Sequence, residues 1–256
     1  MNKTKLLSIV VSLFISITFV SCDNEPIDSM IDLDNFTDVV IDDGDDDGGI
    51  STGDYWPAAL NNQWTFSQNG IDQEPMKIIS INSINGNTYY TFNETFGSST
   101  NGATASPVTR LRKSSGNYYL KIDSFEIDYG QGLTGNISGF EMLLLKDYLS
   151  NGQTWTGTYT QNTTFSDPSF PAITMNTNYT GEVINNNTSI SVNGETFNNV
   201  INVRITQLTS LSGAPVTEVQ TDYWFAKDVG PVKTITYDTT TNLPAYTSLL
   251  QTYILN

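Results

Sequence analysis

The sequence of 256 residues has no histidine and one cysteine, and these two shortages exclude several kinds of active site. Without histidine, the chain has no Ser-His-Asp or Cys-His nucleophile and no histidine-ligated zinc site. Basic residues are also scarce, at 11 against 27 acidic ones, so the net charge of −16 disfavours nucleic acid as a partner. No glycine-rich phosphate loop follows a strand. We predict no metal, no cofactor and no nucleic-acid partner.

Carboxylates are the remaining side chains that could support catalysis. Asp123, Glu126 and Asp128 are close in sequence, and the last two would share one face of a strand. A carboxylate pair of this kind could hydrolyse a glycosidic bond. Solvent-exposed strand residues explain these acids better, and we therefore predict that the protein is not an enzyme.

The one long apolar run lies at the N-terminus and has the form of a secretory signal. Residues 6–20 follow two lysines, and this run is shorter than the roughly 20 residues that a membrane-spanning helix needs. Residues 19–22, Phe-Val-Ser-Cys, resemble a lipobox, in which the cysteine becomes acylated. Phe19 departs from the more usual leucine, as lipoboxes of Bacteroidota tolerate. We predict a signal peptide over residues 1–21 and membrane anchoring through acylated Cys22.

Residues 22–54 are strongly acidic, with twelve Asp or Glu and no Lys or Arg. Such a stretch cannot bury apolar surface and repels itself, which predicts a disordered tether. Residues 41–49 offer five carboxylates to Ca²⁺, but they lack the alternating spacing and final glutamate of an EF-hand loop. Calcium binding is therefore the weaker alternative. The acids at 23–25 resemble the surface-export signal of Bacteroidota lipoproteins, which favours the outer membrane and cell-surface exposure over the periplasm.

Residues 55–256 have the pattern of an all-β domain. Residues 201–206 and 233–237 alternate apolar and polar side chains, as a strand with one solvent-exposed face requires. Asn-Gly pairs between such runs predict two-residue hairpins. No stretch of ten residues has helical periodicity. We predict a mostly antiparallel sheet, with turn signals at 85–86, 116–117, 151–152, 193–194 and 212–213.

Two segments of this domain are similar to each other. Trp64 and Trp155 each follow, by three residues, an Asn or Gly that could adopt a left-handed conformation. Both tryptophans are followed by strands and an Asn-Gly turn. The similarity predicts two related β units, with a subdivision near residue 147.

Short motifs in these segments resemble a broad group of extracytoplasmic β-rich lipoproteins of Bacteroidota. Residues 60–66 are similar to the G-N-x-W-T-Y opening of that group. Residues 197–203 and 223–233 resemble its closing hairpin, in which A-x-x-V-G-x-V-K follows an aromatic strand. The resemblance extends over most of residues 55–237. It implies a curved antiparallel sheet or half-barrel, similar to that of lipoprotein carriers, but the group is largely uncharacterised and implies no activity.

Adjacent aromatic pairs are the candidate ligand-binding residues. On a strand, neighbouring side chains point to opposite faces, so one ring of each pair would face the core and the other would face outward. Exposed rings could stack on sugars or line a concave apolar surface, although half-buried packing would explain them as well. Trp64, Trp155 and the turn at 229–231 are predicted to be structural. The candidate residues are Tyr55, Trp56, Tyr118, Tyr119, Tyr223 and Trp224.

Together these features predict a membrane-anchored, non-catalytic lipoprotein whose β domain binds a glycan or a lipid-like ligand. The alternative is a structural or assembly component of the outer envelope that acts through protein–protein contacts at a sheet edge.

Overall fold

The computed structural model describes residues 49–94, 107–130, 132–211 and 216–256. These residues form strands and no helix, which confirms the predicted all-β class. No helix able to cross a membrane is present in this part of the chain. The predicted signal peptide, Cys22 and the tether up to residue 48 lie outside the described residues. The strands are β1 (Gln63–Gln68), β2 (Ile71–Asp72), β3 (Met76–Ile84), β4 (Asn87–Phe92), β5 (Thr109–Ser114), β6 (Asn117–Ile122), β7 (Phe125–Asp128), β8 (Thr134–Ile137), β9 (Phe140–Lys146), β10 (Thr154–Phe165), β11 (Ile173–Val192), β12 (Glu195–Leu211), β13 (Thr217–Ala226), β14 (Gly230–Tyr237) and β15 (Pro244–Ile254).

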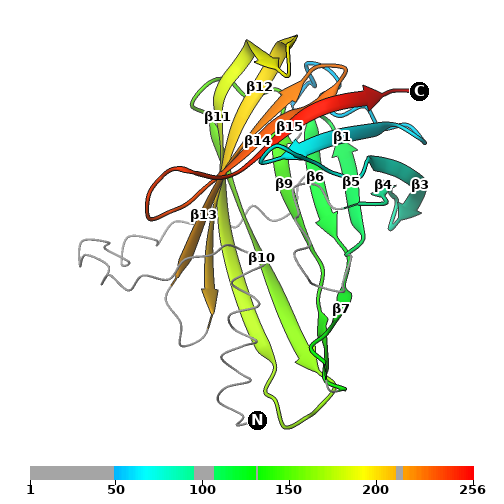
Figure 1. The fold of residues 1–256 in the computed structure, drawn as a ribbon, viewed down its shortest axis with the longest axis vertical. Helices are drawn as coiled ribbons and strands as arrows, with labels where there is room; N and C mark the ends of the chain where they lie inside the picture. Colours follow the sequence, from blue (N-terminus) through cyan, green and yellow to red (C-terminus); the bar gives the residue numbers. More distant parts are fainter. Residues whose placement is uncertain (1–48, 95–106, 131, 212–215) are drawn as a thin grey trace. The chain divides into compact units, whose positions relative to one another are not determined.

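All these strands belong to one antiparallel sheet that is not closed into a barrel (Figure 1). The order is β7-β8-β10-β11-β12-β13-β14-β15-β1-β3-β4-β5-β6-β9, and β2 pairs with β1 alone. Consecutive strands therefore lie side by side in two runs, β10 to β15 and β1 to β9, joined where β15 pairs with β1. The β7–β8 hairpin is inserted into the second run and pairs with β10 instead.

The turns before the two tryptophans have the same backbone hydrogen bonds. Asn61 has a φ of 70° and donates its N–H to the carbonyl of Ile78 (3.0 Å). The Ile78 N–H in turn donates to the carbonyl of Asn62 (2.9 Å). Gly152 has a φ of 77° and donates its N–H to the carbonyl of Val183 (2.7 Å). The Val183 N–H in turn donates to the carbonyl of Gln153 (3.0 Å). The predicted left-handed conformation is confirmed at both positions, whereas the two related β units and the subdivision near residue 147 stay predictions.

Most of the predicted turn signals coincide with turns between strands. Residues 85–86 and 193–194 have positive φ at both positions and connect β3 to β4 and β11 to β12. The turn near residue 116 is formed by Ser115 and Gly116, one residue earlier than predicted, because Asn117 already pairs in β6. The pair at 151–152 precedes Trp155 and does not form a hairpin, because β9 pairs with β6 rather than with β10. The pair at 212–213 lies outside the described residues.

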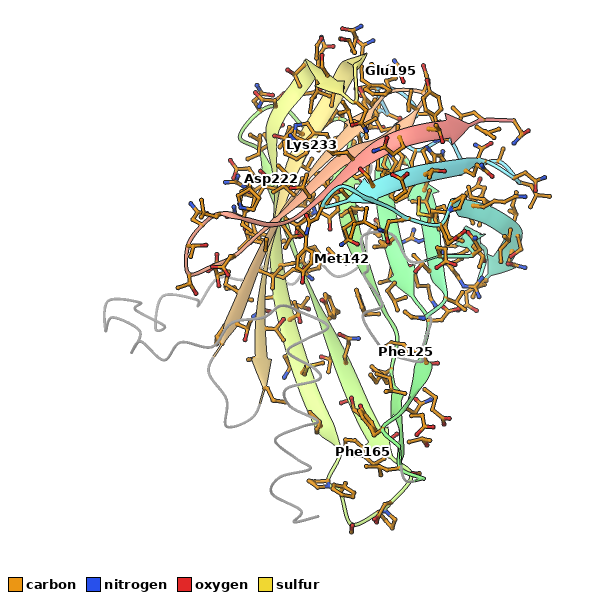
Figure 2. The ribbon with its side chains drawn as sticks, viewed as in Figure 1. Phe125, Met142, Phe165, Glu195, Asp222 and Lys233 are labelled. Carbon is orange, nitrogen blue, oxygen red and sulfur yellow. The ribbon has the colours of Figure 1, made fainter. Side chains whose placement is uncertain are left out.

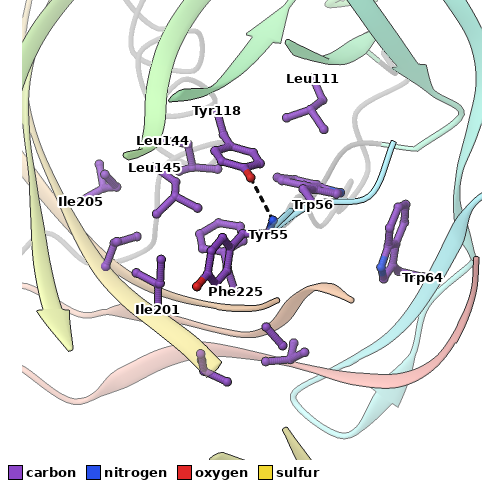
Figure 3. Packing of buried hydrophobic residues seen from close by; sticks show 14 of the residues in the cluster. Tyr55, Trp56, Trp64, Leu111, Tyr118, Leu144, Leu145, Ile201, Ile205 and Phe225 are labelled. Carbon is purple, nitrogen blue, oxygen red and sulfur yellow. Dashed lines mark hydrogen bonds between the residues drawn. The ribbon is translucent and has the colours of Figure 1, made fainter. Parts of the chain in front are cut away.

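Aromatic rings from distant parts of the chain form the centre of the core (Figure 3). The Trp56 ring lies edge-on to Trp64, with centroids 6.5 Å apart, and contacts Phe92 and Phe225 at 5.7 and 5.8 Å. Trp64 also donates its indole N–H to the carbonyl of Val229 (2.7 Å). Pairs of aromatic rings stabilise by about 0.5–1.5 kcal/mol beyond their buried area. This centre therefore fixes the segment before β1 against both runs of strands.

Side chains, rather than a backbone ladder, connect β9 to β10 and β11. Trp155 donates its indole N–H to the carbonyl of Leu143 (3.0 Å), and the Tyr179 hydroxyl accepts the N–H of the same residue (3.0 Å). Both rings lie over glycines, since an added Cβ on Gly181 would overlap Trp155 and one on Gly157 would overlap Tyr179. The sheet thus remains open here, while the two tryptophans predicted to be structural are both buried.

Candidate functional site

The first predicted aromatic pair is entirely buried. Tyr55 and Trp56 are 4% and 0% exposed, and they lie in a bend before β1 rather than on a strand. The alternation of faces does not apply to a bend, so the prediction that one ring of this pair points outward is wrong. Both rings are part of the core cluster.

The other two pairs lie on strands and do divide between the faces. Tyr118 is buried in the core, whereas Tyr119 is half-buried beneath the Arg112 guanidinium, 3.6 Å from its ring centroid. Tyr223 and Trp224 are both half-buried. Tyr223 stacks on Phe225 on the core side, with centroids 6.0 Å apart. Trp224 lies on the opposite face, 4.8 Å from the Lys233 ammonium. The structure therefore does not gather the six predicted residues at one site, and their role in ligand binding stays a prediction.

The last residues of the predicted tether are held by a buried carboxylate. Asp147 is 0% exposed and accepts hydrogen bonds from the Ser51 hydroxyl (2.6 Å) and the Thr52 N–H (3.1 Å). Burial raises the pKa of the Asp147 carboxyl above its usual value, although these donors act in the opposite direction. An ionised carboxylate at this depth needs such donors, because burying an unpaired charge is very unfavourable. The segment from Ser51 is therefore part of the folded domain.

Further contacts from β5, β6 and the turn after β13 hold the same segment. The Tyr118 hydroxyl accepts the Tyr55 N–H (2.9 Å) and donates to the carbonyl of Gly53 (3.0 Å). Lys113 forms an ion pair with Asp54 (2.8 Å). These contacts explain why Tyr118 is buried, and they leave its ring no surface for a ligand. We call this set the tether dock; it comprises residues 51–55, Lys113, Tyr118, Asp147 and Lys227, which donates to the carbonyl of Thr52 (2.8 Å).

A surface pocket of about 230 Å³ adjoins the tether dock, between residues 113–118 and the segment at 51–54. Its two charged groups, Lys113 and Asp54, neutralise each other. The pocket is therefore explained by the dock and offers no charge to a ligand.

The acids considered for catalysis are not gathered in a cleft. The Asp123 carboxylate forms ion pairs with Arg110 (2.7 Å) and with Lys121. Burial is the largest single influence on the Asp123 carboxyl and would raise its pKa, but these two cations together lower it. Glu126 and Asp128 flank the buried Ile127 and share the exposed face of β7, as predicted. Within the described ranges, no cluster of three or more acidic or cysteine side chains could hold a metal ion.

A second group of aromatic rings lies on the core-facing side of β10 to β13, which we call the inner face. Tyr159 stacks on Phe140 of β9, with ring centroids 4.2 Å apart and an interplanar angle of 11°. The ring of Tyr179 is 6.4 Å from that of Tyr159. Tyr223 is half-buried by surface area, yet burial among neighbouring groups raises its pKa to about 12. We call Phe140, Tyr159, Tyr179, Tyr223 and Gln207 the inner tyrosine cluster.

Hydrogen-bonding groups surround these rings. Gln207 donates its side-chain N–H to the Tyr159 hydroxyl (2.8 Å). Burial raises the pKa of Tyr159 as well, so this hydroxyl keeps its proton over the physiological range. Thr177 and Thr209 share a hydrogen bond between their hydroxyls (2.9 Å) on adjacent strands. The inner face therefore combines flat rings with hydroxyl and amide groups.

Two buried hydroxyls on this side have no hydrogen-bond partner. They are the side-chain oxygens of Thr163 and Thr234. The two residues are 1% and 7% exposed. A buried polar atom left without a partner costs about 1–3 kcal/mol, and such atoms are uncommon in folded proteins. The Tyr129 hydroxyl, near Phe165 at the β7–β8 end of the sheet (Figure 2), is a third case.

The inner face also lacks charge. The register of β10 to β13 shows which side chains share the face of the core residues. None of these positions holds a charged residue. They are Trp155, Gly157, Tyr159, Gln161, Thr163, Ile173, Met175, Thr177, Tyr179, Gly181, Val183, Val203, Ile205, Gln207, Thr209, Leu211, Thr217, Val219, Thr221, Tyr223 and Phe225.

Sequence reasoning selected Tyr223 from the inner tyrosine cluster and missed its other members. Tyr159 and Tyr179 are single aromatic residues among threonines and asparagines, so a search for adjacent pairs passes over them. The signal that could have found them is the period of two in 154–164, where threonines alternate with Trp155, Gly157 and Tyr159.

Comparisons with known proteins identify the fold and no family. No protein-family model matches the sequence, and no curated protein matches it. A candidate lipoprotein of Parabacteroides distasonis has a similar solved structure, with a TM-score of 0.50 and 13% identity over 79% of this chain and 99% of that one. A candidate exported protein of Bacteroides fragilis with a YmcC-like fold has a TM-score of 0.43 and 12% identity, over 79% of this chain and 100% of its own. At these identities, the likeness to the Parabacteroides protein shows a shared fold alone.

Proposed function

We propose that this protein is an acylated lipoprotein of the bacterial envelope whose β domain binds a ligand without catalysing a reaction. The lipobox that ends at Cys22 supports the anchor, and the acids at 23–25 support the outer membrane and its cell-surface side. The similar protein of Parabacteroides distasonis is itself a candidate lipoprotein, which supports the anchor. The absence of histidine and the ion-paired state of Asp123 support a non-catalytic role.

The observation that carries ligand binding is the inner face. The half-buried rings of Tyr159 and Tyr223, with the hydroxyl and amide groups around them, lie on one side of four adjacent strands, and no charged residue of these strands faces that side. Ligand sites typically combine aromatic or apolar walls with a few polar groups that orient the ligand. A glycan or a lipid-like molecule would suit such a surface, whereas a nucleic acid would find no basic residue there.

Replacing the lipidated cysteine tests the anchor. We expect Cys22→Ser to move the protein from the membrane fraction to the soluble fraction and to remove the mass of the acyl chains, because dual acylation is what makes such anchoring stable. Ser29→Ala, in the tether, is the matched control and should stay acylated. A Cys22→Ser protein that remains in the membrane fraction would contradict the proposed anchor.

Native mass spectrometry of the protein purified from its envelope tests ligand binding. A reproducible additional mass, released by solvent or denaturant, is the expected result. Tyr159→Ala should lower the fraction of protein that carries this mass. Trp224→Ala, on the opposite face, should leave that fraction unchanged. A bare chain mass in every preparation would contradict ligand binding.

One observation favours the second candidate, a role in envelope assembly through a sheet edge. Among the described residues, β3 pairs on its β1 side only as far as Ile78, so residues 79–84 form an open edge. Ile79 and Ile81 on this edge are 52% and 47% exposed. An open edge with exposed apolar residues is a template for pairing with another strand.

Lysine on that edge tests the assembly role. The paired change Ile79→Lys and Ile81→Lys should abolish co-purification of an envelope protein, because lysine on an edge strand opposes strand addition. Thr158→Lys, on the exposed face of β10, is the control. Equal recovery of the same partner by all three proteins would exclude this edge as the contact.

A further inference from the structure

We propose that the ligand of the inner face is a neutral saccharide; this inference rests on the proposed function and names the chemistry of its ligand. The first step concerns charge. A charged ligand moved from water onto the inner face would lose its hydration and meet no opposite charge, which is strongly unfavourable. Arg204 and Asp222, two charged groups on these strands, point to the other face and are paired with each other (2.7 Å). The absence of charge therefore selects an uncharged ligand.

The second step concerns hydrogen bonds. An acyl chain would cover the inner tyrosine cluster without offering a donor or an acceptor. The Tyr159 hydroxyl and the Gln207 amide pair with each other, and they would then lose water at their remaining hydrogen-bonding positions, at about 1–3 kcal/mol for each unsatisfied group. A ligand with many hydroxyls would pair with the same groups. The polar content of the inner face therefore favours a polyhydroxylated ligand over an acyl chain.

The third step concerns stacking. Sugar rings present C–H faces that pack on flat aromatic rings, as well as hydroxyls at their edges. Phe140 covers one face of the Tyr159 ring at 4.2 Å, and Tyr159 is nevertheless half-buried rather than buried. Phe140 thereby fixes the plane of a ring whose hydroxyl is already oriented by Gln207. Tyr159 and Gln207 together supply an oriented platform with a donor and an acceptor at its rim.

Titration calorimetry on the mature chain with Cys22→Ser tests the inference. The probes are hexamers of α-linked glucose, β-linked glucose, mannose and N-acetylglucosamine, together with a galacturonic acid hexamer and phosphatidylcholine vesicles. We expect one or more neutral hexamers to bind and the other two probes not to bind. Tyr159→Phe and Gln207→Met keep shape and volume, and each should weaken binding about tenfold, the effect of about 1.4 kcal/mol.

Matched controls on the outer face are Tyr119→Phe and Trp224→Phe, which should leave the affinity unchanged. Circular dichroism of each variant shows whether the sheet is retained. Neutral hexamers that fail to bind overturn the saccharide inference. If the vesicles or the galacturonic acid hexamer bind instead, and Tyr159→Phe weakens that binding, the proposed function stands with another ligand class. If no probe binds and the protein from its envelope has a bare chain mass, the proposed function fails as well.

Discussion

A methyl group at Gly181 is predicted to disrupt the connection between β9 and β10. Gly181 does not have a positive φ, so alanine there is not strained by its backbone, and the effect is purely steric. The added Cβ would overlap the indole ring of Trp155. The ring must then move, and it cannot both move and keep its hydrogen bond to Leu143 at 3.0 Å.

The size of the effect follows from these two losses. Forcing an additional carbon into a packed site costs about 1–3 kcal/mol, and a lost hydrogen bond costs about 0.5–1.5 kcal/mol. We therefore expect Gly181→Ala to lower the free energy of unfolding by about 2–4 kcal/mol. Urea denaturation of the mature chain with Cys22→Ser, followed by tryptophan fluorescence, measures this value. Thr180→Ala, at an exposed position on the same strand, should change it by less than about 0.5 kcal/mol.

A double-mutant cycle shows whether the Trp155 ring is the cause. Trp155→Leu removes the atoms that the new methyl group would overlap, so in that background Gly181→Ala should cost less than about 0.5 kcal/mol. The two changes would then be coupled by more than about 1.5 kcal/mol, as expected for residues in contact. An unchanged cost of Gly181→Ala in the Trp155→Leu background would refute the reasoning.

The remaining predictions concern two aspartates. Asp147→Ala should lower the free energy of unfolding by about 2–4 kcal/mol, because it removes the charged acceptor of the part-buried hydrogen bonds from Ser51 and Thr52. Hydrogen exchange should accelerate at Thr52, and unchanged protection there would contradict the tether dock. Asp123 behaves as a pH-dependent stabiliser: its folded pKa lies below 3.8, so its contribution is present above that value and is lost as the pH falls through the folded pKa. Asp123→Asn should therefore flatten the decline in stability below about pH 4, as urea titrations at several pH values would show.

The amino-acid sequence by itself determined the local structure of the strands and turns. Alternating side chains in 201–206 predict one buried face, and Ile201, Val203 and Ile205 are indeed buried. Asn193-Gly194 predicts a hairpin, and both residues have positive φ there. These features depend on the sterics of a few neighbouring residues, which the sequence contains in full.

The similarity between the segments before Trp64 and Trp155 also predicted a shared backbone conformation at two distant positions. Asn61 and Gly152 share a left-handed conformation and a hydrogen-bond pattern, although their sequences differ, because both amino acids tolerate positive φ. The spacing to the following tryptophan drew attention to both positions. What the spacing could not predict is that the two runs of strands join through β15 and β1 while β9 and β10 stay apart.

The tertiary structure alone decided which rings lie together and which are covered. Tyr55 and Trp56 were candidates for a ligand because adjacent rings on a strand would face opposite sides, but contacts with Phe92 and Phe225 bury the indole. Tyr159 became a candidate because β9 brings Phe140 against it. Alternation along a strand divides side chains between two faces, but contacts between residues distant in sequence determine which face encloses the core. For that reason the sequence predicted the sheet, and the inner face emerged only from its folding.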